Sequence, residues 1–188
     1  MSQGDNHAVW EQKLLELEHV QDGIGKGLDQ NIIETVAVLQ LLDVHTRASC
    51  EGHMHHGVAA PWVDIESSDP RLAECRGIYS ELAATADACE DAGQVADAVY
   101  AEMHVIREEI DRIAAVEYKK LIPYLEEFYH GRSAAYTHRI MIDYRGRLSC
   151  QGALLQPAEE VKTRALRLKE YQQEMRAFSE FLKQKFFS

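Results

Sequence analysis

The chain has 188 residues, of which 46% are hydrophobic and 27% charged, and its formal net charge is −11 at pH 7. This size and composition are typical of a single globular domain, residues 1–188, with a hydrophobic core. The acidic charge disfavours nucleic acid as a partner, because phosphate backbones are repelled. No apolar run reaches the roughly 18 residues that a membrane span needs, and the polar N-terminus is unlike a signal peptide, so we expect no membrane partner and a cytoplasmic location.

The first third of the chain is expected to be mainly helical. Apolar residues recur at steps of three and four over 8–20, which predicts a helix. The glycine-rich stretch 22–27 lacks the spacing of a phosphate-binding P-loop, and we interpret it as a connector. Asp29 is the expected N-cap of a second helix, 29–42, which is apolar on nearly all sides and is therefore predicted to be buried.

Two short strands are predicted next, at 45–50 and 61–66. Alternation in the second strand assigns Val63 and Ile65 to one face. The residues assigned to its other face are Trp62, Asp64 and Glu66. Two neighbouring carboxylates are suited to general acid–base chemistry, although such pairs are usually the solvated face of a strand.

Long helices are predicted in the middle of the chain. The Ser-Asp-Pro sequence at 68–70 is a strong helix start, and this helix is expected to end near Ala88. A second helix is expected over 94–129, with a bend at Pro123. It carries a seam that suits a helix pair or a subunit interface, interrupted by Glu117. The seam consists of Val99, Met103, Ile106, Ile110 and Ile113.

The last third predicts a hairpin and a helix. Strands at 140–144 and 147–150 are joined by a turn at Arg145-Gly146, since glycine adopts positive φ readily. Pro157 opens a terminal helix with one apolar stripe. The predicted fold class is therefore α+β, with a small, mainly antiparallel sheet packed against helices, a long helical hairpin and a C-terminal amphipathic helix.

One short pattern occurs twice. Residues 47–52 and 147–152 both read Arg-x-Ser-Cys-[Glu/Gln]-Gly, and both copies end a predicted strand. One interpretation is that the two strands are neighbours that end at the same edge of the sheet, with Cys50 close to Cys150 and His53 nearby. The alternative is coincidence, because strand ends often carry serine and glycine.

The segment 49–57 gathers most of the reactive side chains into nine residues, Ser-Cys-Glu-Gly-His-Met-His-His-Gly. Thiolate and imidazole suit zinc or a related divalent transition metal, so we predict Cys50, His53 and His55 as metal ligands. His56 is adjacent to His55, and neighbouring side chains of an extended segment point apart, so at most one of the two joins the site. The alternative is an exposed histidine-rich loop that binds no metal.

Thiol catalysis is a second hypothesis for this segment. Cys50 would be the nucleophile and His53 its base, with Asp64 or Glu51 orienting the imidazole. Against it, a free cysteine is most often a small buried residue. For either chemistry, the residues predicted to line a ligand site are Ser49, Glu51, Gly52, Trp62, Glu66, Cys150 and Gln151. None of the four cysteines forms a C-x-x-C pair, and all are expected to be free thiols.

Residues 28–66 resemble a family of uncharacterised bacterial and phage proteins. The shared features are Gly-Lys-Gly at 25–27, the apolar helix from Asp29, T-x-x-S-C-E-G-H at 46–53 and P-W-V-D-I at 61–65. This resemblance implies no activity. The S-C-x-G stretch is also similar to one in the wybutosine-synthesising tRNA methyltransferases, with His53 in place of their arginine. That likeness implies S-adenosylmethionine or nucleotide binding, whereas the net charge argues against a tRNA partner.

Two classes of function remain open at this point. The first is a protein that binds a small molecule or a metal at the 49–56 turn. If it is an enzyme, hydrolysis or group transfer through Cys50, His53 and Asp64 is the class we favour. The second is a helical interaction or assembly protein that forms a homo-oligomer through its long helices, in which the turn only stabilises the edge of the sheet.

Overall fold

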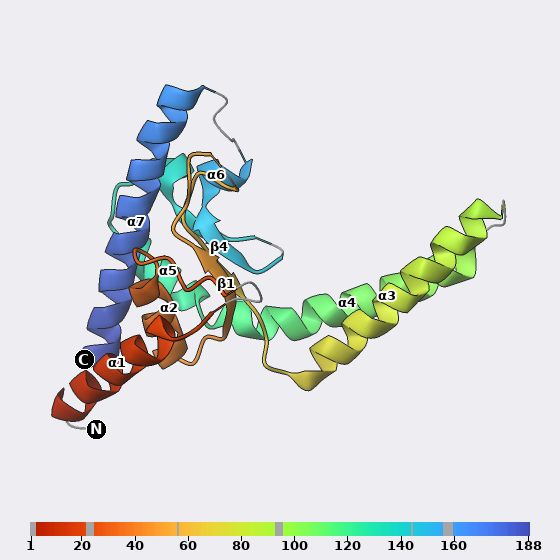
Figure 1. Ribbon diagram of the computed structural model, residues 1–188, viewed down its shortest axis with the longest axis horizontal. Helices are drawn as coiled ribbons and strands as arrows, with labels where there is room; N and C mark the ends of the chain where they lie inside the picture. The colour runs from red at the N-terminus through yellow and green to blue at the C-terminus, as the bar shows by residue number, and fades with distance from the viewer. Residues whose placement is uncertain (1–2, 22–24, 56, 93–95, 144, 156–159) are drawn as a thin grey trace.

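The computed structural model describes residues 3–21, 25–55, 57–92, 96–143, 145–155 and 160–188. These residues confirm the predicted α+β fold, in which a small antiparallel sheet packs against helices and one helical pair extends away from it (Figure 1). In chain order the elements are α1 (Gln3–Glu18), α2 (Ile33–Leu41), β1 (Thr46–Cys50), β2 (Trp62–Ile65), α3 (Pro70–Asp91), α4 (Asp97–Lys119), α5 (Ile122–Tyr129), the short 3₁₀ helix η1 (Tyr136–His138), β3 (Ile140–Ile142), β4 (Arg147–Cys150), α6 (Gln151–Leu155) and α7 (Val161–Phe187).

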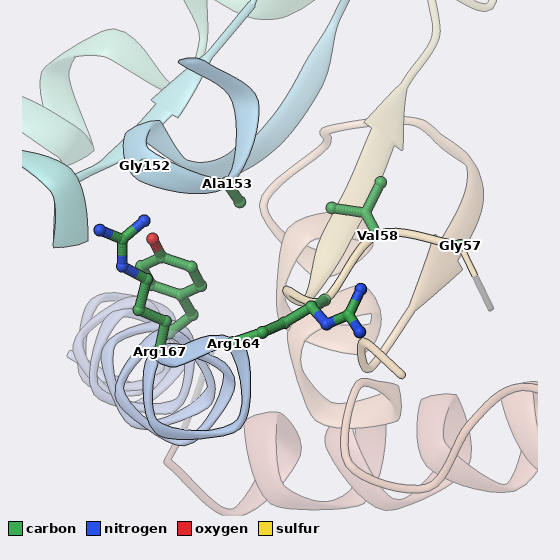
Figure 2. Close-up of a pocket in the computed structure, with 8 residues that line it drawn as sticks. Gly57, Val58, Gly152, Ala153, Arg164 and Arg167 are labelled. Atoms are coloured by element: carbon green, nitrogen blue, oxygen red, sulfur yellow. The ribbon is translucent and has the colours of Figure 1, made fainter. Parts of the chain in front are cut away.

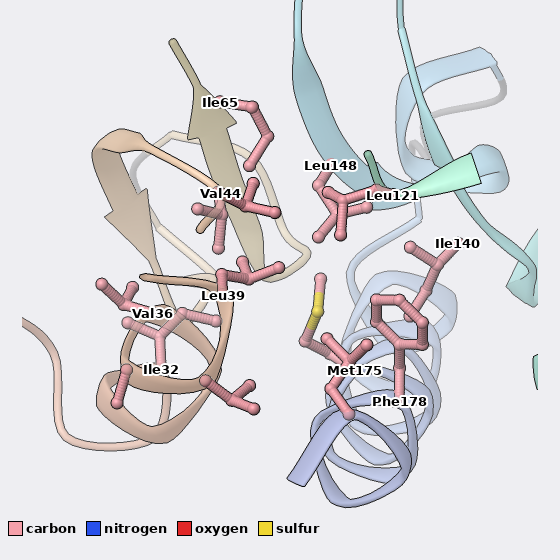
Figure 3. Packing of buried hydrophobic residues seen from close by; sticks show 14 of the residues in the cluster. Ile32, Val36, Leu39, Val44, Ile65, Leu121, Ile140, Leu148, Met175 and Phe178 are labelled. Atoms are coloured by element: carbon pink, nitrogen blue, oxygen red, sulfur yellow. The ribbon is translucent and has the colours of Figure 1, made fainter. Parts of the chain in front are cut away.

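The hydrophobic core lies between α2, α7 and one face of the sheet (Figure 3). Four of its residues are completely buried: Ile32, just before α2, Leu39 in α2, Leu148 in β4 and Phe178 in α7. The α2 segment is buried on several faces because α1, α7 and β1 all pack against it. Its nearly all-apolar sequence therefore reflects a helix enclosed by other elements, as predicted.

The strand order is β1-β2-β4-β3, and every neighbouring pair is antiparallel. The expectation that the two Arg-x-Ser-Cys strands are neighbours is therefore wrong, because β2 lies between β1 and β4. The two strands nevertheless run in the same direction and end at the same edge, since each is antiparallel to β2. Two strand spacings amount to about 9–10 Å, which is too far for a Cys50–Cys150 disulfide; both cysteines are free.

The repeated arginines flank one carboxylate on the central strand. Arg147 of β4 donates to Asp64 of β2 from Nε at 2.7 Å and from Nη2 at 3.0 Å, and Arg47 of β1 lies 3.5 Å from the same carboxylate. The Arg147 guanidinium also lies 4.0 Å from the centre of the Trp62 ring. Asp64 is buried, so these charge-assisted bonds compensate for its lost hydration.

The predicted alternation in β2 is confirmed. Val63 and Ile65 belong to the core, while Trp62 and Asp64 face the arginines on the other side of the sheet. The hairpin between β3 and β4 also turns where predicted. Gly146 has a φ of +85°, and the Asp143 side chain accepts hydrogen bonds from the backbone of Arg145 and Arg147.

Several predicted helix boundaries differ from the structure. Asp29 does not cap the second helix, which begins at Ile33 and has no side-chain cap, because the Asp29 carboxylate bonds elsewhere. The expected helix 94–129 is two helices, since Pro123 belongs in the first turn of α5 and the chain bends just before it. The short α6 was not predicted. Pro157, the expected start of the terminal helix, lies outside the described residues.

The helices α3 and α4 form the predicted hairpin, which projects from the body of the protein (Figure 1). The predicted cap is confirmed, because Asp69 accepts a hydrogen bond from the backbone of Arg71. The helix α4 packs against α3 of the same chain, and the seam residues of α4 are partly or fully buried. At its base, buried Glu117 accepts hydrogen bonds from the His45 backbone at 2.7 Å and from Lys120 at 3.1 Å, which fixes the hairpin to the sheet. Among the described residues, no helix combines the length and the apolar character needed to cross a bilayer.

We predict that Asp64→Asn lowers the free energy of unfolding by about 1–3 kcal/mol, because it removes the charge that both arginines bind. The measurement is urea denaturation followed by circular dichroism. The matched control is Asp111→Asn, whose side chain is exposed and pairs with Arg107 one helical turn away. That substitution should cost less than about 0.5 kcal/mol. Equal effects of the two substitutions would contradict the structural role of Asp64.

Candidate functional site

A tight turn follows β1 and depends on Gly52. The backbone of Gly52 has a φ of +87°, and a Cβ at this position would lie 2.6 Å from the carbonyl carbon of Ala60. Only glycine combines this conformation with such a close approach. The turn thereby allows Cys50, at the end of β1, and His53, just beyond it, to face a common point.

The third member of this group is Asp29, which lies in the segment before α2. The Cys50 thiol, one His53 ring nitrogen and one Asp29 carboxylate oxygen all lie within 4.8 Å of one another. His53 Nε2 is 3.3 Å from Asp29 Oδ2. All three residues are partly buried. Sulfur, nitrogen and oxygen donors therefore converge from two separate segments of the chain, which we call the Asp29–Cys50–His53 triad.

Glu51 fixes the turn against its neighbours. Its backbone N–H donates to Asp29 Oδ2 at 3.2 Å, and its carboxylate accepts two hydrogen bonds from Asn31, at 3.0 and 2.9 Å. Its carbonyl oxygen accepts a third bond, from the Gln172 side chain of α7 at 3.0 Å. Predicted to line a ligand site, Glu51 instead clamps the turn to the Asp29 segment and to α7.

The Asp29 carboxylate is held in its charged form. Burial alone would raise its pKa, but the hydrogen bond from the Glu51 backbone and the nearby Lys26 ammonium, 3.1 Å away, hold the pKa below its ordinary value. Asp29 is therefore ionised at neutral pH. An ionised carboxylate is an acceptor for a cation and for the imidazole beside it.

The Cys50 thiol, in contrast, is held in its neutral form. Burial raises its pKa, the negative charge of Asp29 raises it further, and the hydrogen bond from the Gly52 backbone at 3.4 Å only partly offsets these effects. Cys50 is therefore a neutral thiol at neutral pH in the metal-free protein. A cysteine nucleophile needs the reverse, a pKa lowered by positive surroundings.

A surface hollow of about 340 Å³ adjoins the triad. Asp29 belongs to its wall, together with Lys26, Arg47, Ser49 and Trp62. The Ser49 hydroxyl is buried and has no hydrogen-bond partner among the described residues. Two of the predicted ligand-site residues, Ser49 and Trp62, thus line a hollow that shares a carboxylate with the triad.

The other predicted site residues lie elsewhere. Asp64 binds the two arginines of the sheet, and the carboxylate beside His53 is Asp29 instead. Glu66 forms an ion pair with Arg76 of α3. The remaining three are placed as follows: His55 is exposed and outside the triad, Cys150 is fully buried with its sulfur 3.9 Å from the Tyr171 carbonyl oxygen, and Gln151 begins α6.

Sequence reasoning missed Asp29 and Lys26 as site residues. An aspartate directly before an apolar helical run is typical of a helix cap, so the sequence around Asp29 predicts a cap and not a site residue. The glycine-rich stretch containing Lys26 was interpreted as a connector, yet Lys26 and Gly27 line the hollow. Asp29 and Cys50 are 21 residues apart, and no sequence pattern predicts that their side chains lie close together.

Comparison with protein-family models, curated proteins and solved structures finds no significant match to this chain. The two resemblances noted in the sequence therefore stay predictions.

We predict that Cys50 in the metal-free folded protein reacts slowly with iodoacetamide. The rate should rise with a midpoint above the ordinary thiol pKa of 9.0, because burial and Asp29 disfavour the thiolate that reacts. Mass spectrometry of the Cys50 peptide after timed labelling gives the rate at each pH. The same peptide in the urea-denatured protein is the control and should react faster at pH 8. A midpoint below pH 8 in the folded protein would instead indicate an activated nucleophile.

Proposed function

We propose that this protein binds a divalent transition metal ion, with zinc as the favoured metal, through Asp29, Cys50 and His53. The observation that supports the proposal is the convergence of their three donor atoms within 4.8 Å. A thiolate, an imidazole and a carboxylate are the ligand types that zinc takes in proteins. The proposal rests on this combination of sulfur, nitrogen and oxygen donors and not on the number of histidines in the turn.

The surroundings of the triad suit a metal better than a thiol nucleophile. Without a metal the Cys50 thiol stays protonated, because burial and Asp29 raise its pKa. A bound cation reverses this effect, since a coordinating thiol loses its proton. The Gly52 N–H that points at the sulfur then stabilises a thiolate, and the hydrogen bond from Glu51 orients the Asp29 carboxylate.

Three protein ligands leave one position of a tetrahedral zinc ion for water or a small molecule. The hollow that shares Asp29 with the triad is the adjoining space for such a molecule. Lys26 and Arg47 in its wall are each paired with a carboxylate, Asp29 and Asp64, and the Trp62 ring offers an apolar surface. We therefore propose a metal-dependent binding site for a small molecule, held by the fourth position of the metal.

The test of the metal site is zinc binding by the purified full-length chain, measured by calorimetry and by elemental analysis after dialysis. We expect one zinc ion per chain. Asp29→Asn, Cys50→Ser and His53→Gln should each weaken binding by about tenfold or more, because each removes a ligand. Circular dichroism verifies that each variant is folded.

His55→Gln is the matched control, because it removes a histidine of the same turn that lies outside the triad. Zinc affinity should be unchanged in this variant. Loss of zinc in His55→Gln together with full binding in Asp29→Asn would contradict the proposed ligand set. Absence of zinc binding by the unmodified chain would refute the proposed function.

A second candidate function is self-assembly through the α3–α4 hairpin. The hairpin projects from the body (Figure 1). Val105 and Val116 of α4 are each 62% exposed. Eleven residues separate them, which is close to three helical turns and places both on one face. A second copy of the chain packing on this face would complete a four-helix bundle.

We predict that such a dimer would depend on Val105 and Val116. Light scattering at high concentration should give twice the chain mass of 21.3 kDa, and the double variant Val105→Glu/Val116→Glu should give a monomer. Val161→Glu is the control, since Val161 is 57% exposed on α7, away from the hairpin. A monomer at all concentrations, or a dimer that survives the double substitution, would exclude this function.

A further inference from the structure

A second cavity borders the loop that follows the triad. It is enclosed by the N-terminal part of α7, by residues 57–59 between β1 and β2, and by the start of α6, and its volume is about 190 Å³ (Figure 2). His53 is joined to this loop by a hydrogen bond from its backbone to the Val58 carbonyl oxygen, at 3.4 Å. The cavity contains no member of the triad.

The α7 wall of the cavity contains buried polar groups with few partners. Tyr171 is only 2% exposed, and its hydroxyl interacts with Arg167 and has no further hydrogen-bond partner among the described residues. The Nε of Arg164 is buried without a partner. Buried polar groups of native proteins are normally hydrogen-bonded, so these two groups offer hydrogen-bonding capacity to a molecule in the cavity.

The charge of the cavity specifies an anion. Two arginines, Arg164 and Arg167, border it, and no carboxylate lines it among the described residues. Figure 2 shows Arg164 extending toward Val58 and Arg167 toward Gly152, so that the cavity opens between them. This is a local concentration of positive charge on a chain whose net charge is −11.

Tyr171 adds a hydrogen-bond donor to this wall. Burial raises the pKa of its phenol, so the hydroxyl keeps its proton at neutral pH. Gly152 makes the approach to this hydroxyl possible, because a Cβ at that position would clash with the Tyr171 oxygen. A carboxylate can accept one bond from an arginine and one from the tyrosine with its two oxygens.

The opposite wall is apolar. It is formed by Val58, Ala59 and Ala153, which offer methyl groups and no polar side-chain atoms. The volume equals about six water molecules at roughly 30 Å³ each, which limits a ligand to a few carbon atoms. From these observations we infer that the cavity binds a short aliphatic carboxylate, with its charged end between Arg164 and Arg167 and its hydrocarbon end on the apolar wall.

The inference is independent of the metal proposal and is tested separately. The full-length protein is titrated calorimetrically with sodium butyrate, with inorganic phosphate as the comparison anion and the buffer salt held constant. We expect butyrate to bind at one site and phosphate to bind at least tenfold more weakly, because phosphate leaves the apolar wall uncovered. Arg164→Gln should weaken butyrate binding at least tenfold and Tyr171→Phe severalfold.

Two further variants keep the result interpretable. Ala153→Leu fills the cavity without removing a polar group and should abolish butyrate binding, while Arg112→Gln, on the distant hairpin, should leave it unchanged. Zinc binding should persist in all four variants, which separates failure of this inference from failure of the metal site. Absence of butyrate binding, equal binding of phosphate, or unchanged butyrate affinity in both Arg164→Gln and Ala153→Leu would overturn the inference.

Discussion

The structure depends on the buried carboxylate of Asp64, which joins three strands. Arg147 binds it from one side with two hydrogen bonds, at 2.7 and 3.0 Å, and Arg47 approaches it from the other. A buried carboxylate requires such partners, because its hydration is lost on folding. The pairing therefore favours one alignment of β1 and β4 on either side of β2, and this alignment sets where both strands end. This arrangement therefore sets the position of Cys50, at the end of β1, and of Gly52 and Gly152, which follow the two strands.

The common strand ends explain the repeated Arg-x-Ser-Cys-[Glu/Gln]-Gly pattern in physical terms. Gly52 and Gly152, the last residues of the two copies, both meet α7 where a side chain would clash, at Leu168 and at Tyr171 respectively. These two contacts lie one helical turn apart on α7. The pattern therefore combines an arginine for the shared carboxylate with a glycine for close approach to the same helix. The arginine-bordered cavity lies beside the second of these contacts, because Gly152, Tyr171 and the loop 57–59 all line it.

Much of the fold could be predicted from local signals. The alternation of Val63 and Ile65 identified the core face of β2, Asp69 and Pro70 identified the start of α3, and Gly146 identified the hairpin turn. These features depend on the physical preferences of a few adjacent residues. The site instead depends on contacts between residues that are far apart in the sequence, and no local pattern predicts such contacts. The sequence therefore suggests a helix cap at Asp29. It also suggests a catalytic role for Asp64, whose carboxylate in fact binds two arginines.

The account of function depends on Asp29, Cys50 and His53 acting as one set of ligands. Its most direct test is X-ray absorption spectroscopy at the zinc edge of the zinc-loaded full-length protein. We predict one sulfur at about 2.3 Å, with the remaining neighbours being nitrogen and oxygen at about 2.0–2.2 Å. If the Cys50→Ser variant retains zinc, its absorption spectrum should show no sulfur neighbour. A first shell of nitrogen and oxygen alone in the unmodified protein, or one with two or more sulfurs, would contradict the proposed site.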